Sequence, residues 1–220
     1  MNPNITIPLF PLGVVLIPDS PLPLHIFEER YKLMINNCLD EQVEFGIVYF
    51  NGNEVSNIGC TARILKVTKR YEDGRMDIIT RGAKRFIIHE LFDEKAYLQA
   101  RIEYFDDIAE IPRDDLKDLA SKGLTLLEQL EKLTYTEENR SQVDLEDFKS
   151  ISFLIAGCEG FTHEEKQKFL EMTSTSQRLD KSVAALENII QRLKLTVKIK
   201  KIIGGNGQVS ESIQDNSTPH

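Results

Sequence analysis

The chain of 220 residues carries 35 acidic and 27 basic side chains, a formal net charge of −8 at neutral pH. Broad attraction to nucleic acid or anionic lipid requires a basic surface, so this balance argues against both kinds of partner. The hydrophobic content of 41% is that of a globular protein and excludes wholesale disorder. We therefore expect a folded protein with no membrane partner, for which nucleic acid is an unlikely ligand.

The N-terminal sequence MNPNITIPLF lacks a basic stretch and contains prolines, so it does not predict a signal peptide. No apolar run approaches the ~20 residues of a membrane-spanning helix. Cys38, Cys60 and Cys158 lie in apolar sequence and cannot all pair, which favours buried thiols in a reducing compartment. Together these features predict a cytoplasmic protein.

Short strands are predicted throughout the first hundred residues. Asp73-Gly74 is typical of a tight hairpin turn, and the prolines of the first runs suit edge strands or bulges. At least six strands at this spacing favour a small closed or half-closed barrel. The predicted strands span residues 5–10, 14–17, 45–50, 62–69, 76–80, 85–91 and 97–105.

One helix is predicted among the strands, at residues 25–39. Its apolar side chains Phe27, Tyr31, Ile35 and Cys38 recur at helical spacing and form a single stripe. We expect this stripe to be buried and the helix to lie across one opening of the barrel.

Beyond the charged segment 106–113 the apolar period becomes helical. Thr162 and Glu165 have the spacing of a capping box, which begins a helix. The last helix has the most regular pattern, with apolar residues stepping by four and three as in a coiled coil. The three predicted stripes comprise Leu116, Leu119, Leu124, Leu127 and Leu130; Phe148, Ile151 and Ile155; and Leu179, Val183, Leu186, Ile190, Leu193 and Val197.

The fold prediction is therefore α+β. A β-rich, barrel-like part with one capping helix occupies residues 1–108, a helical bundle occupies residues 109–203, and a disordered tail rich in Gly, Ser, Asn and Gln occupies residues 204–220.

Motifs for nucleotide, metal or nucleophile chemistry are missing from the sequence. It contains no G-x-x-x-x-G-K-[ST], G-x-S-x-G, H-E-x-x-H or C-x-x-C. We therefore predict no catalytic residue, no metal site and no cofactor. Two basic groups are interpreted as solvated faces that could alternatively contact an acidic partner; they are Arg81, Lys84 and Arg85 on a turn, and Lys194, Lys198, Lys200 and Lys201 at the end of the last helix.

Two segments carry a family resemblance, IPLFPLGVVLIPDSPLPLHIFEERY from Ile7 to Tyr31 and GCTARILKVTKRYEDGRMDIITRGAKRFII from Gly59 to Ile88. Their LFPL opening, IFExRY motif, G-x-x-A-R-I strand and D-G-R hairpin closely resemble the N-terminal, substrate-binding domain of Lon proteases. The segment PLHIFEERY is similar to stand-alone bacterial proteins made of this domain. Gly59 and Gly74 are interpreted as positions that need unusual backbone dihedrals.

The resemblance implies a PUA-like barrel and a non-catalytic module that binds protein or peptide, without the ATPase and protease domains of Lon. Its partners would be unfolded or client polypeptides, or another protein. Our predicted binding residues are Tyr49 and Phe50, beside the Asn51-Gly52-Asn53 turn, and Tyr71 beside the hairpin turn. The alternatives are nucleic-acid binding through the PUA-like barrel and an unrecognised hydrolase that uses Cys or Ser.

Overall fold

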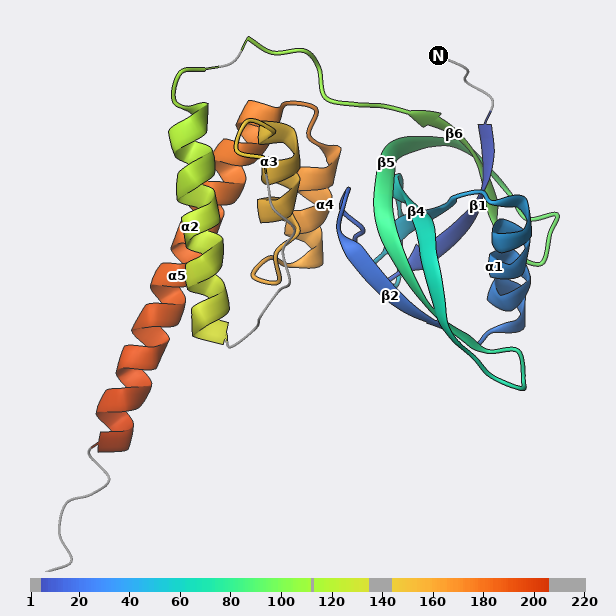
Figure 1. Ribbon diagram of the computed structural model, residues 1–220, viewed down its shortest axis with the longest axis horizontal. Coiled ribbons are helices and arrows are strands. Elements are labelled where there is room, and N and C mark those ends of the chain that lie inside the picture. Colours follow the sequence, from blue (N-terminus) through green and yellow to red (C-terminus); the bar gives the residue numbers. More distant parts are fainter. Residues whose placement is uncertain (1–4, 112, 135–143, 206–220) are drawn as a thin grey trace, which may run out of the picture.

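The structure, a computed structural model, describes residues 5–111, 113–134 and 144–205. Strands dominate the first half of the chain and helices the second, which confirms the predicted α+β class (Figure 1). The elements are β1 (Ile5–Leu12), β2 (Pro21–Ile26), α1 (Glu29–Glu41), β3 (Phe45–Phe50), β4 (Val55–Arg70), β5 (Met76–Phe92), β6 (Gln99–Tyr104), α2 (Leu116–Thr134), α3 (Phe148–Ala156), α4 (His163–Glu171) and α5 (Thr175–Gly205).

The strands form one six-stranded sheet in the order β2-β5-β4-β3-β1-β6. All neighbours are antiparallel except β1 and β3, which run parallel. Strand β5 is long enough to pair with β2 through its first part and with β6 through its second, in addition to β4. Because β6, the last strand of this order, also pairs with β5, the sheet curls strongly (Figure 1).

Three predicted strands differ from the structure. Residues 14–17 form a loop rather than a strand, and its Leu16 and Ile17 side chains are buried. Residues 76–80 and 85–91 belong to the single strand β5, so Arg81, Lys84 and Arg85 lie within a strand and not on a turn. The pairing of β5 with β4 shifts its register in this region, so β5 continues as one strand. A register shift of this kind leaves no periodic signal in the sequence.

The helix predicted at residues 25–39 begins later. His25 and Ile26 pair with β5 as the end of β2, and α1 starts at Glu29. Tyr31 and Ile35 are buried as expected, but the Phe27 side chain lies before the helix and is 59% exposed. The ladder between β2 and β5 therefore overrides the helical spacing that placed Phe27 in the buried stripe.

Two glycines of β4 and β5 allow close backbone approach. A Cβ at Gly59 would lie 2.4 Å from the Ile47 carbonyl oxygen, and one at Gly82 would lie 2.1 Å from the Ile17 carbonyl oxygen. Gly59 is therefore required for its small size and not for the unusual dihedrals that we predicted. Gly74 does adopt a positive φ, of 81°, at the hairpin turn.

The helical half follows the predicted stripes. Leu179, Val183, Leu186 and Ile190 of α5 are buried against α2 and α3, while Val197 is 54% exposed and lies outside the stripe's buried part. The capping box is confirmed, since the Glu165 amide donates to Thr162 Oγ1 at 3.2 Å and the Thr162 amide donates to Glu165 Oε2 at 2.9 Å.

The prediction of buried thiols is confirmed, because Cys38, Cys60 and Cys158 are all buried. Of the predicted tail, residues 204–205 belong to α5 instead, and residues 206–220 lie outside the described part of the chain. Among the helices that the structure describes, none is both apolar enough and long enough to cross a membrane.

Candidate functional site

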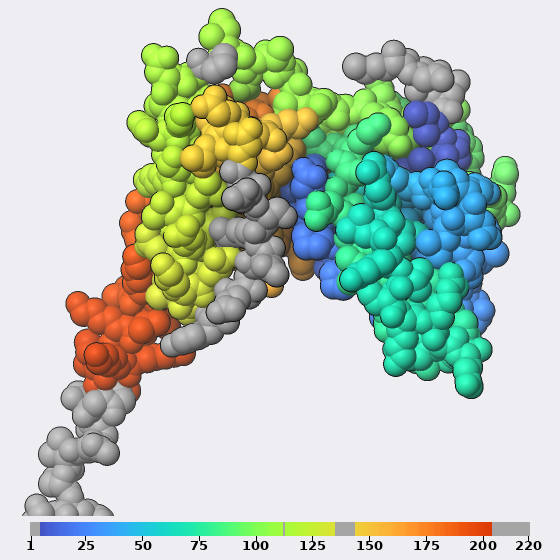
Figure 2. Space-filling view, viewed as in Figure 1, coloured from blue at the N-terminus to red at the C-terminus, as the bar shows by residue number. Residues whose placement is uncertain are grey.

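The sheet and the helical half share apolar packing. Phe153 of α3 and Leu170 of α4 belong to the same buried cluster as α1 and the sheet residues Phe45 and Ile47. Figure 2 shows the two halves in contact along this junction. The junction is therefore a packed interface, and a cavity beside it has walls from both halves.

A buried charged cluster fixes the junction. Arg85 of β5 donates to the Leu170 carbonyl at 3.0 Å and to Asp107 Oδ1 at 2.5 Å, and its side chain is only 2% exposed. Arg178 of α5 is fully buried, donates to the same carboxylate and lies over the Phe153 ring, 3.7 Å from its centroid. One aspartate in the connection after β6 therefore joins a strand to a helix.

Asp107 stays ionised because of these donors. Burial alone would raise the pKa of its carboxyl, but hydrogen bonds from Arg178 and Thr175 and the charges of Arg178 and Arg85 outweigh burial and lower the pKa. The carboxylate therefore compensates both guanidinium groups, whose side chains are 2% exposed in Arg85 and 0% exposed in Arg178.

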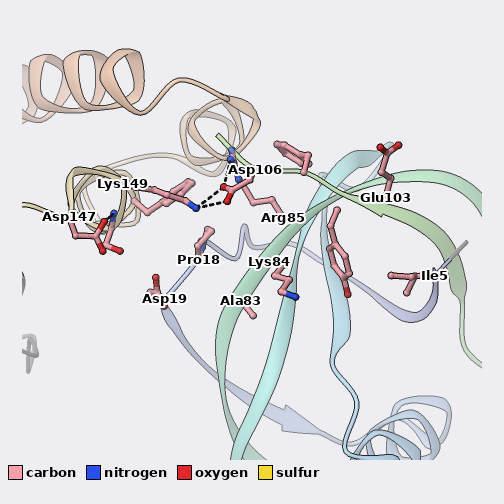
Figure 3. Close-up of a pocket in the computed structure, with 14 residues that line it drawn as sticks. Ile5, Pro18, Asp19, Ala83, Lys84, Arg85, Glu103, Asp106, Asp147 and Lys149 are labelled. Atoms are coloured by element: carbon pink, nitrogen blue, oxygen red, sulfur yellow. Dashed lines mark hydrogen bonds and ion pairs between the residues drawn. The ribbon is translucent and has the colours of Figure 1, made fainter. Parts of the chain in front are cut away.

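A cavity of about 560 Å³ opens beside this cluster, between β5, β6 and the start of α3 (Figure 3). Its apolar walls are three aromatic and three aliphatic residues. Partial burial raises the pKa of the Tyr104 hydroxyl, so this group remains a neutral hydrogen-bonding group at neutral pH. The apolar lining consists of Tyr104, Phe105, Phe153, Ile5, Pro18 and Ala83.

Charged side chains surround this apolar lining. The Lys149 ammonium pairs with Asp106 at 2.6 Å, and the Lys84 ammonium lies 5.2 Å from the Tyr104 ring centroid. Asp19, which has a positive φ of 62°, and Asp147, which caps α3, add carboxylates to the charged lining. Figure 3 shows both of these carboxylates on the α3 side of the cavity.

This arrangement suits recognition of an amphipathic segment. Ligand sites of this volume are typically apolar with a few oriented polar groups, and protein interfaces combine an apolar centre with a charged rim. The cavity can take up one or more apolar side chains of a partner while Lys84, Asp19 and Asp147 bond to its polar groups.

Two of the predicted binding residues, Tyr49 and Phe50, lie at the end of β3. The Tyr49 hydroxyl donates to Glu164 of α4 at 2.9 Å, and its ring lies 5.8 Å from that of His163. Phe50 is 39% exposed. Another depression, of about 270 Å³, adjoins Tyr49. Tyr49 therefore lies at a surface where the sheet half contacts α4, apart from the cavity beside α3.

The third predicted residue, Tyr71, is not near the other two. Phe50 pairs with Val55 at the start of β4, whereas Tyr71 follows the end of this 16-residue strand. Tyr71 donates to Asp77 Oδ2 at 2.9 Å, and its ring makes an edge contact with His25, which stacks on the exposed Phe27. The structure thus separates the predicted residues into two surfaces, and neither includes the cavity between β5, β6 and α3.

Sequence reasoning missed the cavity residues Tyr104, Phe105 and Phe153. Phe105 is the last residue of a predicted strand and Phe153 lies between Ile151 and Ile155 of a predicted helix, so both resemble ordinary core positions. The available signal was the charged segment that starts at Asp106, directly after two aromatic residues. Only the packing of α3 against β5 brings these side chains together.

Two of the thiols, Cys38 and Cys60, are poorly suited to nucleophilic chemistry. Burial, helped by the nearby Glu41 carboxylate, raises the pKa of Cys38 to about 12, and burial likewise raises the pKa of Cys60. Within the described residues, no group of three or more His, Cys, Asp or Glu side chains could hold a metal ion.

Comparison with known proteins identifies the family. The model of the ATP-dependent protease La (LON) substrate-binding domain matches residues 6–188, which is most of the chain. The chain belongs to the Lon substrate-binding domain family. The resemblance carried by the sequence motifs is therefore confirmed, and the match extends through the helical half as well as the sheet.

Curated relatives of this Lon substrate-binding domain include the Lon protease of Anaeromyxobacter dehalogenans, 28% identical over 217 residues, and that of Escherichia coli strain K12, 26% identical over 215 residues. These alignments cover 90% and 91% of this chain, but 25% and 27% of the relatives. The chain spans about a quarter of the length of the curated relatives that it matches.

Solved structures of similar fold cover both halves. A Lon N-terminal domain protein from Xanthomonas campestris aligns with a TM-score of 0.65 and 21% identity, over 82% of this chain and 98% of that one. The N-terminal domain of a Mycobacterium avium complex Lon protease aligns with a TM-score of 0.61 and 19% identity, over 83% and 98% of the two chains. A sheet followed by a helical half is thus the fold of Lon N-terminal domains.

Proposed function

We propose that this Lon substrate-binding domain recognises segments of other polypeptides without itself catalysing a reaction, and that the cavity between β5, β6 and α3 is its principal binding site. The observation that carries the proposal is the cavity of about 560 Å³ between the two halves, with aromatic side chains in its walls. A protein-recognition role is that of the family, and the cavity supplies the apolar site that such a role requires.

The physical basis is the burial of apolar side chains. Unfolded polypeptides expose aromatic and branched residues that folded proteins cover, and a cavity lined by Phe105 and Tyr104 would remove them from water. The surrounding charges on Lys84, Asp19 and Asp147 would bond to the polar groups of the bound segment. The domain would then select client segments by their exposed apolar residues and not by one defined residue.

A binding measurement on the Phe105→Ala variant tests the site. The probe is a fluorescently labelled unfolded protein such as casein, titrated with the full chain and followed by anisotropy. Removing the Phe105 ring deletes part of the apolar wall, and we expect about a tenfold loss of affinity, as for a buried aromatic at an interface. Leu91→Ala is the matched control, because Leu91 is 50% exposed and lies near the far end of β5.

Circular dichroism melts of both variants separate loss of binding from loss of folding. If casein does not bind the wild-type chain, or if folded Phe105→Ala binds it as tightly as the wild type, the cavity is not the binding site.

The predicted residues Tyr49, Phe50 and Tyr71 are proposed as secondary contacts for a longer client segment. Phe50 is exposed beside the depression at Tyr49, and Tyr71 contacts His25, which stacks on the exposed Phe27. Each single alanine substitution should weaken casein binding less than Phe105→Ala does. A larger loss in Phe50→Ala or Tyr71→Ala would move the principal site to that surface.

A further inference from the structure

Helix α5 extends past the bundle that its first part stabilises. Its buried positions end at Ile190, Leu193 is partly buried, and each side chain from Lys194 to Ile203 is exposed. Figures 1 and 2 show this last part of α5 reaching away from the other helices. It also lies beyond residue 188, where the match to the family model ends.

The extension carries two stripes. Leu195, Ile199 and Ile202 occur at i, i+4 and i+7, with Ile203 beside them, and their exposed fractions lie between 46% and 69%. Lys194, Lys198 and Lys201 also occur at i, i+4 and i+7, each one residue before a member of the apolar stripe. They form a basic stripe that runs beside the apolar stripe. An apolar stripe of this exposure is a surface that a partner normally covers.

The charged residues in the last part of α5 are all basic. From residue 188 to residue 205 the helix contains Arg192 and four lysines but no acidic residue, although the whole chain has a net charge of −8. The net charge, which predicted no membrane partner, therefore hides a local basic surface. This surface complements an anionic partner, and the lipid surface is the one that also accepts isolated apolar side chains.

We propose that residues 192–203 of α5 dock on the surface of an anionic lipid bilayer, with the helix lying in the plane of the interface. The apolar stripe enters the boundary between headgroups and acyl chains. Lys198 on one side of this stripe and Lys200 on the other extend to the lipid phosphates, as in other interfacial amphipathic helices. This proposal is independent of polypeptide binding in the cavity.

A second copy of the chain fits this surface less well. Pairing two copies of the segment would bring their lysine stripes together at short range. The coiled-coil seam formed by Leu193 and Val197 is followed by Lys200 and Lys201, so it does not continue as an apolar seam. The anionic bilayer satisfies both the lysines and the apolar stripe.

Vesicle flotation of the full chain tests the proposal. We expect binding to vesicles of phosphatidylcholine with 30% phosphatidylglycerol at low salt, little binding to phosphatidylcholine alone, and release in 0.5 M NaCl, where exposed charges are screened. The triple variant Lys198→Gln, Lys200→Gln, Lys201→Gln should lower the partition coefficient on the order of 100-fold, since each basic residue near such a surface contributes about fivefold.

The matched control is the triple variant Lys66→Gln, Lys95→Gln, Lys181→Gln, which removes the same charge from exposed positions elsewhere. It should bind vesicles as the wild type does. A second variant, Leu195→Gln with Ile199→Gln, should weaken vesicle binding while leaving the thermal melt unchanged, because neither side chain packs on the bundle.

Four results would overturn the proposal. They are no binding to anionic vesicles, equal loss in both lysine variants, a dimer in sedimentation experiments that Leu195→Gln with Ile199→Gln dissolves, and salt-sensitive RNA binding through the lysine stripe without vesicle binding. The dimer would assign the stripe to a second copy, and the RNA result would assign it to nucleic acid.

Discussion

The tightest glycine contacts of the β-rich half and of the helical half differ in kind. In the sheet, Gly59 and Gly82 face carbonyl oxygens of Ile47 and Ile17, so backbone meets backbone. In the helical half, Gly123 faces the end of the Ile155 side chain, which can move. The sheet should therefore respond sharply to small changes and the helices mildly.

The junction of the two halves combines apolar packing with buried charge. Phe153 and Leu170 of the helical half belong to the apolar cluster of the sheet, and Arg85, Arg178 and Asp107 form ion pairs where the halves join. A buried cluster of this kind requires all of its members, because one left alone is a charge without compensation. The junction should consequently be the most sensitive part of the molecule.

The largest effect should follow Asp107→Ala. This change removes the carboxylate that pairs with both guanidinium groups and leaves Arg85 only the Asp106 carboxylate at 3.6 Å, so we expect the free energy of unfolding to fall by about 3–5 kcal/mol. Urea denaturation followed by circular dichroism measures the change. Asp114→Ala, an exposed aspartate of the same connection, should change it by less than about 0.5 kcal/mol. Equal small effects in the two variants would mean that the junction is not held by this cluster.

Acid should weaken the ion pairs that Asp107 forms with Arg85 and Arg178. The pKa of Asp107 is lower in the folded chain than its unfolded value of about 3.9. Its contribution to stability is therefore complete above the unfolded pKa and is lost as the pH falls through the folded pKa. In urea titrations from pH 7 to pH 2.5, Asp107→Asn should show a flatter acid limb than the wild type. Parallel limbs would assign the acid sensitivity to other carboxylates.

Gly82→Ala should be the next most damaging change. Its Cβ would lie 2.1 Å from the Ile17 carbonyl oxygen, so the loop before β2 or the strand itself must shift. Forced overpacking of this kind costs about 3 kcal/mol. If the melting temperature of Gly82→Ala lies within two degrees of the wild type, the backbone at Ile17 moves readily. The sheet would then be no more sensitive to glycine substitution than the helical half.

Gly123→Ala provides the matched test in the helical half. The new methyl group meets Ile155 Cδ1 at 2.3 Å, but this atom ends a side chain that can rotate. The helix propensity of alanine, about 1 kcal/mol better than glycine, offsets part of the cost. We expect a net loss of about 1 kcal/mol or less in urea denaturation, and a loss as large as that of Gly82→Ala would contradict the comparison.

The smallest effect should come from Tyr49→Phe. The lost hydrogen bond joins Tyr49 to Glu164, and both groups are open to water that can replace the partner. We expect no measurable change in the urea midpoint. A clear shift would indicate that the contact between β3 and α4 contributes to holding the halves together.

Much of the fold could be predicted because its signals are local. The stripe from Leu179 to Ile190, the capping box at Thr162 and the turn at Gly74 each depend on neighbours a few residues away. The family motifs likewise predicted the sheet half and its class. The exact strands were harder, because pairing with a distant partner made residues 76–92 one strand and placed His25 in β2.

The candidate site could not be predicted from spacing. Phe105 and Phe153 are 48 residues apart in the chain and become neighbours of one cavity only when α3 packs against β5. The residues predicted from the sequence, Tyr49, Phe50 and Tyr71, were chosen because they lie beside turns. Whether a residue beside a turn joins a cavity depends on what packs over it, and no local pattern encodes that.

By itself, the sequence determined the α+β class, the helical stripes, the buried thiols and the membership in the Lon family, because periodicity, capping and motif order are properties of neighbouring residues. The tertiary structure decided that Phe27 is exposed, that Arg85 is buried on a strand, and that α5 continues past its bundle. These depend on which surfaces cover one another, and coverage is set by contacts between segments far apart in the chain.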